Sequence, residues 1–382
     1  EGSNWGPVWS PGGNTLAFYS DRGGQAGLWV WEKAADTLRQ VSDAIVRPFH
    51  GDEVVRWTPD SRKALCKVLP EGMTLEEGLS LIMGSRQEIS GEKEERKPSA
   101  LVYWSPAAMG QNDGAGKQGE NMPEADVTNV CLSDLALIAV STGKVKRITY
   151  RLKILGHWLS PDGTKVALIV LRKTFYDIIV VSLPDDRTQV VASDIQQSHK
   201  FALSWSPDGR LISYTSGGDC FVVPASGGEP RKLTEAPHPS FDPVYRPPLW
   251  DATGQNLYFL ASDTLWRVAV ADGATTAATR IPNRQLVEVA SPAGEGRFWS
   301  PDGGRTLYLI TRDEETKRLG FDKVDLTTGQ FTSLVEENAT CGSPAIFTID
   351  VSDDGKHVIY TKQDAQHCEN VWIAGIDFQN PR

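Results

Sequence analysis

Short apolar runs and polar turns alternate along the whole chain. LAFYS at 16–20, LISYTS at 211–216 and LYFLAS at 257–262 are such runs, rich in β-branched and aromatic side chains. A polar turn and a second apolar run follow each of them, as in LWVW at 28–31. The pattern predicts short antiparallel strands joined by tight turns. Because several runs are apolar on both faces, the sheets they form must be covered on both faces.

One phrase recurs between these runs, and its clearest copy is WSPDGR at 205–210. Successive copies lie 48, 101, 47, 45, 49 and 52 residues apart. All but one of these intervals match the period of about 40–50 residues that is typical of a four-stranded propeller blade. The seven copies begin at Trp9, Trp57, Trp158, Trp205, Trp250, Trp299 and Val351.

The chemistry of the phrase predicts a hairpin turn. Pro at the second turn position fixes φ near −65°, Asp bonds back to the local backbone, and Gly accepts a positive φ. The Trp that precedes the turn is large enough to fill the space between two neighbouring sheets. We therefore expect each copy to follow an innermost strand that ends at the Trp.

Seven such units predict an all-β fold, a seven-bladed β-propeller that forms a single domain over residues 1–382, with six or eight blades as alternatives. The last blade stops where its outermost strand should begin, so we expect the natural chain to continue. The predicted blades are 5–48, 52–150, 153–196, 199–240, 244–284, 286–338 and 344–382.

The one long interval predicts an insertion within blade two, at 71–127. MTLEEGLSLIM at 73–83 has the apolar spacing of a helix, which Thr74 would cap. Glu76 and Glu77 fall in its first turn, where carboxylates suit the helix dipole. A charge run, a short strand at 101–104 and a Gly-rich polar loop follow. We expect this insertion to project from one face of the ring.

Composition excludes several classes of protein. The net charge of −10 and pI near 5.2 argue against a nucleic-acid-binding protein. No apolar run reaches the ~18 residues of a membrane span, so we expect no membrane partner. The five cysteines form no CxxC pair, and those in apolar runs, Cys66 and Cys220, are expected to be buried.

Motifs for chemistry are missing or misplaced. The GxGxxG at 114–119 follows no predicted strand, as a nucleotide-binding loop would. No GxSxG nucleophile elbow occurs in the sequence. Ser80, in GLSLI at 78–82, lacks the second glycine of that motif and lies in the helical pattern. His50 with Asp52 and Glu53 could form a metal site at a channel mouth, although a polar loop between blades is the favoured interpretation. We therefore predict no catalytic residue, no metal and no cofactor.

Adjacent carboxylates leave one candidate binding site. Glu76 and Glu77, on a helix that projects over a propeller, could hold the free amine of a peptide by charge-assisted hydrogen bonds. The favoured alternative is that both residues only compensate the helix dipole.

The phrase, together with SDRGG at 20–24 and LWVW, resembles the propeller repeats of TolB-like proteins and of the prolyl oligopeptidase family of serine peptidases. KVLPEGMTLEEG at 67–78 and PSALVYWSP at 98–106 are similar to acylaminoacyl-peptidase and dipeptidyl-aminopeptidase-like members of that family. The ending ENVWIAGIDFQNPR resembles the last propeller strands before an α/β-hydrolase domain. The catalytic Ser, Asp and His of the family belong to that domain and have no counterparts here.

The resemblance implies a non-catalytic propeller that gates and selects peptides for a hydrolase domain of the same polypeptide. The partners would be that domain and peptide substrates, and the compartment periplasmic or secreted. The alternatives are a stand-alone TolB-like interaction scaffold and a metal-dependent propeller enzyme such as a lactonase, which the scattered His residues argue against.

Overall fold

The structure is a computed structural model that describes residues 2–47, 55–83, 129, 131–172, 175–196, 203–234, 248–261, 263–290, 298–338, 350–352, 355–362 and 370–382. Nearly all regular structure in these ranges is antiparallel β-sheet, which confirms the all-β prediction. We call each set of consecutive strands a unit and number the units from the N-terminus.

The helix lies within the first three units. Unit one comprises β1 (Asn4–Trp9), β2 (Thr15–Ser20), β3 (Gly27–Glu32) and β4 (Thr37–Gln40). Unit two comprises β5 (Arg56–Trp57), β6 (Lys63–Val68), α1 (Leu75–Met83), β7 (Leu132–Ala139) and β8 (Val145–Arg147). Unit three comprises β9 (Leu152–Leu159), β10 (Lys165–Arg172), β11 (Phe175–Ser182) and β12 (Thr188–Ile195).

The later units repeat the same strand order. Unit four comprises β13 (Leu203–Trp205), β14 (Leu211–Ser216), β15 (Asp219–Pro224) and β16 (Arg231–Lys232). Unit five comprises β17 (Leu249–Trp250), β18 (Asn256–Ala261), β19 (Thr264–Ala269) and β20 (Thr275–Arg280). Unit six comprises β21 (Arg284–Val289), β22 (Thr306–Asp313), β23 (Leu319–Asp325) and β24 (Phe331–Glu337), and unit seven β25 (Asp350–Val351), β26 (His357–Lys362) and β27 (Asn370–Gly375).

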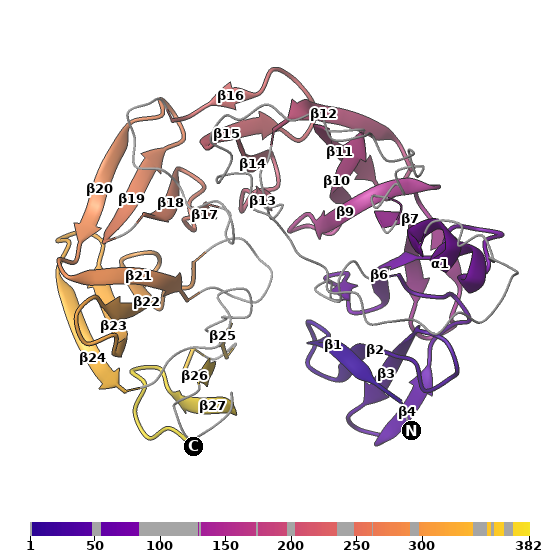
Figure 1. Cartoon of the computed structure of the whole chain (residues 1–382), viewed down its shortest axis with the longest axis horizontal. Helices are drawn as coiled ribbons and strands as arrows, with labels where there is room; N and C mark the ends of the chain where they lie inside the picture. The colour runs from indigo at the N-terminus through magenta and orange to yellow at the C-terminus, as the bar shows by residue number, and fades with distance from the viewer. Residues whose placement is uncertain are drawn as a thin grey trace, which may run out of the picture.

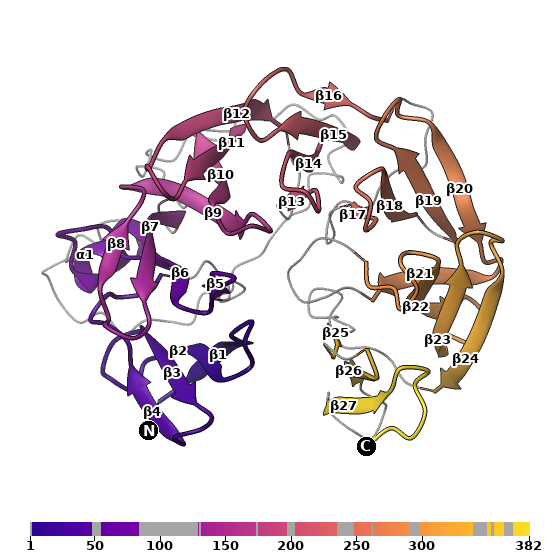
Figure 2. The ribbon, with the colours of Figure 1, turned by 180° about the vertical axis from the view of Figure 1, so that it is seen from behind.

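The units follow one another around an arc, with the first strand of each on the inner side and the last on the outer side (Figures 1 and 2). Units one and seven stand at the two ends of the arc, on either side of an opening. Units two and three form one continuous sheet, because Leu132 and Ser133 of β7 pair with Lys153 and Leu152 of β9. A closed ring of seven blades therefore stays a prediction.

The recurring phrase forms the turn that its chemistry predicts. In WSPDGR the Ser206 amide donates to the carbonyl of Leu211 at 2.9 Å, and Gly209, with φ of +68°, donates to that of Ser206 at 2.9 Å. The Asp208 carboxylate accepts the Ser206 hydroxyl at 2.6 Å and the Arg210 amide at 3.0 Å. The same pair of backbone hydrogen bonds recurs at the copies that begin at Trp9, Trp57, Trp158, Trp250 and Val351.

At three copies the repeated Trp links its unit to the one before it. Trp57 Nε1 donates to the carbonyl of Val8 at 3.1 Å, Trp205 to that of Trp158 at 3.0 Å, and Trp250 to that of Ser204 at 3.3 Å. All three rings also pack within the apolar cluster shared with the preceding unit. The expectation that these rings fill the space between sheets is confirmed at these copies.

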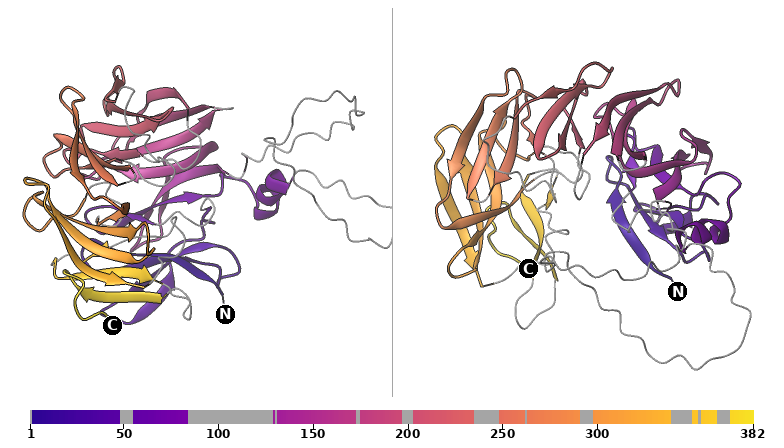
Figure 3. Two further views of the ribbon diagram at one scale, coloured as in Figure 1. Left: turned by 60° about the vertical axis from the view of Figure 1, so that its left-hand side comes forward. Right: turned by 45° about the horizontal axis from the view of Figure 1, so that its top comes forward.

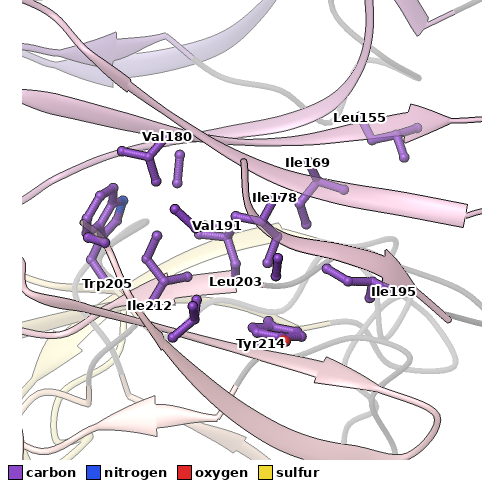
Figure 4. Packing of buried hydrophobic residues seen from close by; sticks show 14 of the residues in the cluster. Leu155, Ile169, Ile178, Val180, Val191, Ile195, Leu203, Trp205, Ile212 and Tyr214 are labelled. Atoms are coloured by element: carbon purple, nitrogen blue, oxygen red, sulfur yellow. The ribbon is translucent and has the colours of Figure 1, made fainter. Parts of the chain in front are cut away.

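Figure 4 shows one such cluster, between units three and four. Ile169, Ile178 and Val180 of unit three face Trp205 and Ile212 of unit four. Burial of apolar area of this kind, at about 25 cal/mol per Å², is the main force that holds neighbouring sheets together.

The sixth copy departs from the expected order. β21 ends at Val289, ten residues before Trp299, so this innermost strand does not end at its Trp. The Trp299 amide still donates to the carbonyl of Ala290 at 2.8 Å, so the chain returns to the end of β21 before the turn. Phe298 packs against the preceding unit and Trp299 against the next. At this copy Phe298, and not the Trp, contacts the preceding unit.

The helix begins and ends as the sequence pattern predicts, and it stands to one side of the stacked sheets (Figure 3). It follows the end of β6, whereas the turn of unit two precedes the start of β6. The turns and α1 therefore lie at opposite ends of the strands. We call these the turn side and the helix side. Residues 84–127 of the predicted insertion lie outside the described residues.

Among the described residues, no helix is long and apolar enough to cross a bilayer.

Candidate functional site

The first turn of α1 carries the two carboxylates that the sequence singles out. Glu77 Oε2 accepts the Thr74 amide at 2.7 Å and the Thr74 hydroxyl at 3.1 Å, while the Glu77 amide donates to Thr74 Oγ1 at 3.1 Å. These reciprocal hydrogen bonds form a capping box. They also lower the pKa of Glu77, with a smaller contribution from the nearby positive charge of Arg151. Glu77 thus already has a structural role.

Glu76 is exposed beside Glu77, and its side chain makes none of these capping bonds. Its backbone carbonyl accepts the hydroxyl of Ser80 at 2.9 Å, so Ser80 bonds back to its own helix. An exposed carboxylate accepts charge-assisted hydrogen bonds from a cationic amine. Both residues therefore stay a predicted contact for a peptide amine.

The helix rests on unit two through Gly78. A Cβ at this buried glycine would lie 2.9 Å from Cδ1 of Leu69 and 3.0 Å from a guanidinium nitrogen of Arg47. Burial lowers the pKa of Arg47, whose guanidinium also reaches the carbonyl of Asn129 at 3.4 Å. The absence of a side chain at Gly78 thus lets α1 approach the sheet closely.

A fully buried carboxylate ties the base of the helix segment to units two and three. Asp134 Oδ2 accepts Nη1 of Arg147 at 2.5 Å and the Glu71 amide at 3.0 Å, and Oδ1 accepts the Arg151 amide at 2.6 Å. Arg147 Nη1 also donates to the carbonyl of Leu69 at 2.9 Å. Because these hydrogen bonds satisfy the buried carboxylate, the network fixes the segment that leads into α1 and the β8–β9 link in place.

This network is not among the sites predicted from the sequence. A charged residue inside the apolar strand LSDLALIA is the signal that could have identified it, because a buried carboxylate needs several partners. Its partners are Arg147, the last residue of β8, and Arg151, in the link to β9, and neither stands in an apolar run that would signal it.

Other candidate groups have structural surroundings or lie outside the described residues. Burial raises the pKa of the Cys66 and Cys220 thiols to about 12, which confirms the prediction that both are buried and leaves neither as a thiolate nucleophile. His50, Asp52, Glu53 and the GxGxxG segment lie outside the described residues. Within the described ranges, no three His, Cys, Asp or Glu side chains lie close enough to hold a metal ion.

No model of a known protein family matches the chain. Solved structures do share its fold. An oligogalacturonate lyase from Vibrio parahaemolyticus has a TM-score of 0.58 at 11% identity, over 96% of this chain and 87% of that chain. The β-propeller domain of the Trilobed protease from Pyrococcus furiosus, described as having an open velcro topology, has a TM-score of 0.51 at 10% identity, over 100% and 99%.

A prolyl endopeptidase has a TM-score of 0.51 at 13% identity, over 98% of this chain and 47% of that chain. The chain thus spans about half the length of that peptidase. At these identities the likeness concerns the fold alone. The resemblance noted in the sequence is confirmed at that level, because β-propellers of peptidases are among the structures that share this fold.

Proposed function

We propose that this chain is a seven-bladed β-propeller domain that gates and selects peptide substrates for a serine peptidase α/β-hydrolase domain of the same polypeptide. The observation that supports the proposal is how much of each chain aligns. The whole chain aligns with the isolated propeller domain of one protease and with about half of a prolyl endopeptidase. A chain of this fold and length corresponds to the non-catalytic part of such an enzyme.

In this role the chain contributes exclusion and orientation, while the peptide bond is cleaved elsewhere. Sheets packed face to face around an arc make a rigid wall, since each is held to its neighbours by apolar clusters and indole hydrogen bonds. A wall of this kind restricts which peptides reach a catalytic centre, and a fixed contact positions the peptide that does.

The helix side offers one polar contact of this kind. Glu76, exposed at the N-terminus of α1, would accept hydrogen bonds from the free amine of a short peptide, and Glu77 would add charge from within its capping box. Asp134 and Arg147 would hold the helix still while it does so.

The reading frame beyond the Arg382 codon tests the proposal directly. We expect a GxSxG motif there, followed by an Asp and a His at the positions of a catalytic triad. A stop codon near that point would contradict the proposal and would favour the stand-alone interaction scaffold.

Assays of the purified chain give an independent test. We expect no hydrolysis of acyl-peptide or aminoacyl chromogenic substrates. An oligogalacturonate lyase in complex with manganese also shares the fold, so oligogalacturonate cleavage, with and without added Mn²⁺, is the matched assay. Turnover of either substrate that survives repurification would overturn the non-catalytic role.

A further inference from the structure

The four residues that join β8 to β9 present two consecutive side chains to solvent. Ile148 and Thr149 are buried, and the Thr149 hydroxyl oxygen accepts the Leu135 amide at 2.9 Å. Tyr150 and Arg151, which follow them, are exposed, and the exposed fraction of Tyr150 is 61%. Because β9 runs from this link to its turn, the link lies on the helix side. The buried half of the link therefore anchors two side chains that face solvent there.

Arg151 has a backbone conformation that its residue type does not favour. Its φ is +50°, in the left-handed region that Gly, Asn and Asp adopt far more readily than a long side chain does. The carboxylate of Asp134, fully buried in β7, accepts the Arg151 amide at 2.6 Å and holds this conformation. Strained positions persist where their surroundings fix them, and they gather at functional sites. The arginine is therefore better explained by what its side chain binds than by the turn it forms.

The Arg151 guanidinium is free to bind a ligand. It makes neither a hydrogen bond nor an ion pair with any residue that the structure describes. The two neighbouring arginines differ from it, since Arg147 is bound by Asp134 and Arg47 contacts two backbone carbonyls. A free guanidinium matches the two oxygens of a carboxylate and binds them through parallel hydrogen bonds.

One buried carboxylate also brings Arg151 to the first turn of α1. Asp134 accepts the Arg151 amide through Oδ1 and the Glu71 amide through Oδ2, so the β8–β9 link and the segment that leads into α1 flank the same group. The positive charge of Arg151 is close enough to Glu77 to contribute to the lowered pKa of that carboxyl. Glu76 is exposed beside Glu77. The helix side thus carries an exposed carboxylate and an exposed guanidinium on two segments that Asp134 holds together.

We propose that Arg151 and Tyr150 extend the amine contact of α1 into a site for short peptides that carry a carboxylate near their free amine. The amine binds Glu76, the peptide carboxylate binds the Arg151 guanidinium, and the Tyr150 ring packs against the aliphatic part of the peptide. Asp134 is a positioning residue, because it fixes the backbone of Arg151 without reaching the peptide. The inference rests on the proposed amine contact and adds the class of substrate.

Charge makes this selection work in both directions. A peptide carboxylate gains charge-assisted hydrogen bonds from Arg151, whereas a Lys side chain in the same place meets a like charge. The carboxylate belongs either to an acidic side chain or to the C-terminus of a very short peptide. Both sources present the same two oxygens, so peptides that differ in only one of them separate the two.

Peptide binding to ¹⁵N-labelled protein tests this site. The probes Ala-Glu-Ala-amide, Ala-Gln-Ala-amide and Ala-Lys-Ala-amide differ in their second side chain and lack a C-terminal carboxylate. Kd is taken from the NMR shifts of the amides of α1 and of the β8–β9 link. We expect the Glu peptide to bind at least roughly threefold more tightly than the Gln peptide, and the Lys peptide more weakly than both. Ala-Ala against Ala-Ala-amide measures the gain from a C-terminal carboxylate in the same way.

Substitutions of Arg151 separate the role of its side chain from that of its backbone. Arg151→Asn keeps the amide that Asp134 binds, and Asn adopts a positive φ more readily than Arg, so we expect a Tm no lower than that of the parent. The preference for a carboxylate should disappear in this variant, and Arg151→Glu should invert it. Lys144→Glu is the matched control, because it makes the same charge change at an exposed residue on the turn side of unit two. It should leave the preference unchanged.

Several outcomes would overturn the inference. One is an equal Kd for all peptides in the parent chain, with no gain from either source of carboxylate. Another is a preference for the Glu peptide that survives Arg151→Asn, or that Lys144→Glu abolishes as fully as Arg151→Glu does, since overall charge would then explain it. A large loss of Tm in Arg151→Asn would show that the arginine serves the fold.

Acetylation of the peptide amine keeps this inference distinct from the contact on which it rests. If N-acetyl-Ala-Glu-Ala-amide binds as tightly as the free peptide, Glu76 does not hold the amine, and the contact and the site built on it both fail. If acetylation abolishes binding while the second side chain has no effect, the amine contact stands and the role of Arg151 fails. The gating function is decided separately, by the reading frame beyond the Arg382 codon.

Discussion

At the scale of single residues, the repeated turn depends on side chains whose roles can be separated. Asp208 holds the turn through hydrogen bonds, Gly209 supplies the positive φ, and Trp205 reaches into the preceding unit. Ser61 takes the place of the glycine in the second copy and still adopts a φ of +59°. The turn geometry therefore comes from the whole phrase rather than from the glycine alone.

Glycines in successive turns should differ in their tolerance of a methyl group. Gly163 and Gly209 have nearly equal φ values, +69° and +68°, but a Cβ at Gly163 would lie 2.4 Å from Pro59 and one at Gly209 3.7 Å from Pro161. We expect Gly209→Ala to cost about 1–2 kcal/mol of unfolding free energy, from the left-handed backbone alone. Gly163→Ala should cost roughly 2–4 kcal/mol, because overpacking adds to that cost.

Urea denaturation of both variants measures this difference. Equal losses in the two variants would show that the turns of units two and three do not touch.

The turn carboxylates make stability depend on pH. Hydrogen bonds from the Ser206 hydroxyl and the Arg210 amide lower the pKa of Asp208. When folding lowers the pKa of a carboxyl group, the ionised carboxylate stabilises the folded state at every pH above the unfolded-state pKa of about 3.9. This stabilisation is lost as the pH falls through the lower pKa of the folded state. We expect Asp208→Asn to lower Tm at pH 7 and to differ less from the parent as the pH falls below about 4.

Thermal unfolding from pH 7 to pH 2.5 checks this dependence. Ser206→Ala is the control, since it keeps the carboxylate but removes its main hydrogen bond. A Tm difference for Asp208→Asn that stays constant over this range would contradict the assignment.

At the scale of elements, sequence patterns located the strands and the helix better than the contacts between them. The turn phrase identified the start of β2, β6, β10, β14 and β18, because Pro, Asp and Gly act locally. The pairing of β7 with β9 has no local signal, since it depends on where two strand ends meet in space. The repeat spacing also does not reveal that Trp299 lies outside its strand. The interval before this copy is of ordinary length, yet β21 ends at Val289, ten residues before the Trp.

In the candidate site, too, local features could be predicted from the sequence and long-range contacts could not. Thr74, Glu76 and Glu77 were found from helix-capping preferences, which are local. The anchoring of α1 by Arg47 and Asp134 joins segments 31 and 63 residues apart, and no short-range pattern encodes such contacts.

The capping box should control the order of α1. Thr74→Ala removes the hydroxyl that the Glu77 amide uses, and a lost N-cap costs about 1 kcal/mol of helix stability. Because α1 is a short helix at one end of unit two, we expect faster hydrogen exchange in its amides and little change in global Tm. Glu76→Gln is the matched control and should leave exchange in α1 nearly unchanged. A large global loss with Thr74→Ala would place α1 within the folding core.

At the scale of the whole molecule, the apolar clusters of the described residues are shared between adjacent units. Stability in such an architecture is approximately a sum of unit terms and nearest-neighbour interface terms. The continuous sheet of units two and three is an exception, since backbone hydrogen bonds join them. Damage at one interface should therefore spread to adjacent units before it reaches the far end of the arc.

Trp250→Ala tests this locality. Trp250 is fully buried, packs with Cys220 and Val222 of unit four, and donates to the carbonyl of Ser204. Removal of a buried Trp side chain costs roughly 3–5 kcal/mol. We expect amide exchange to accelerate most in units four and five and least in units one and two, as followed by hydrogen–deuterium exchange and mass spectrometry. Equal acceleration in all units would mean that the arc unfolds as one cooperative body in a single global transition.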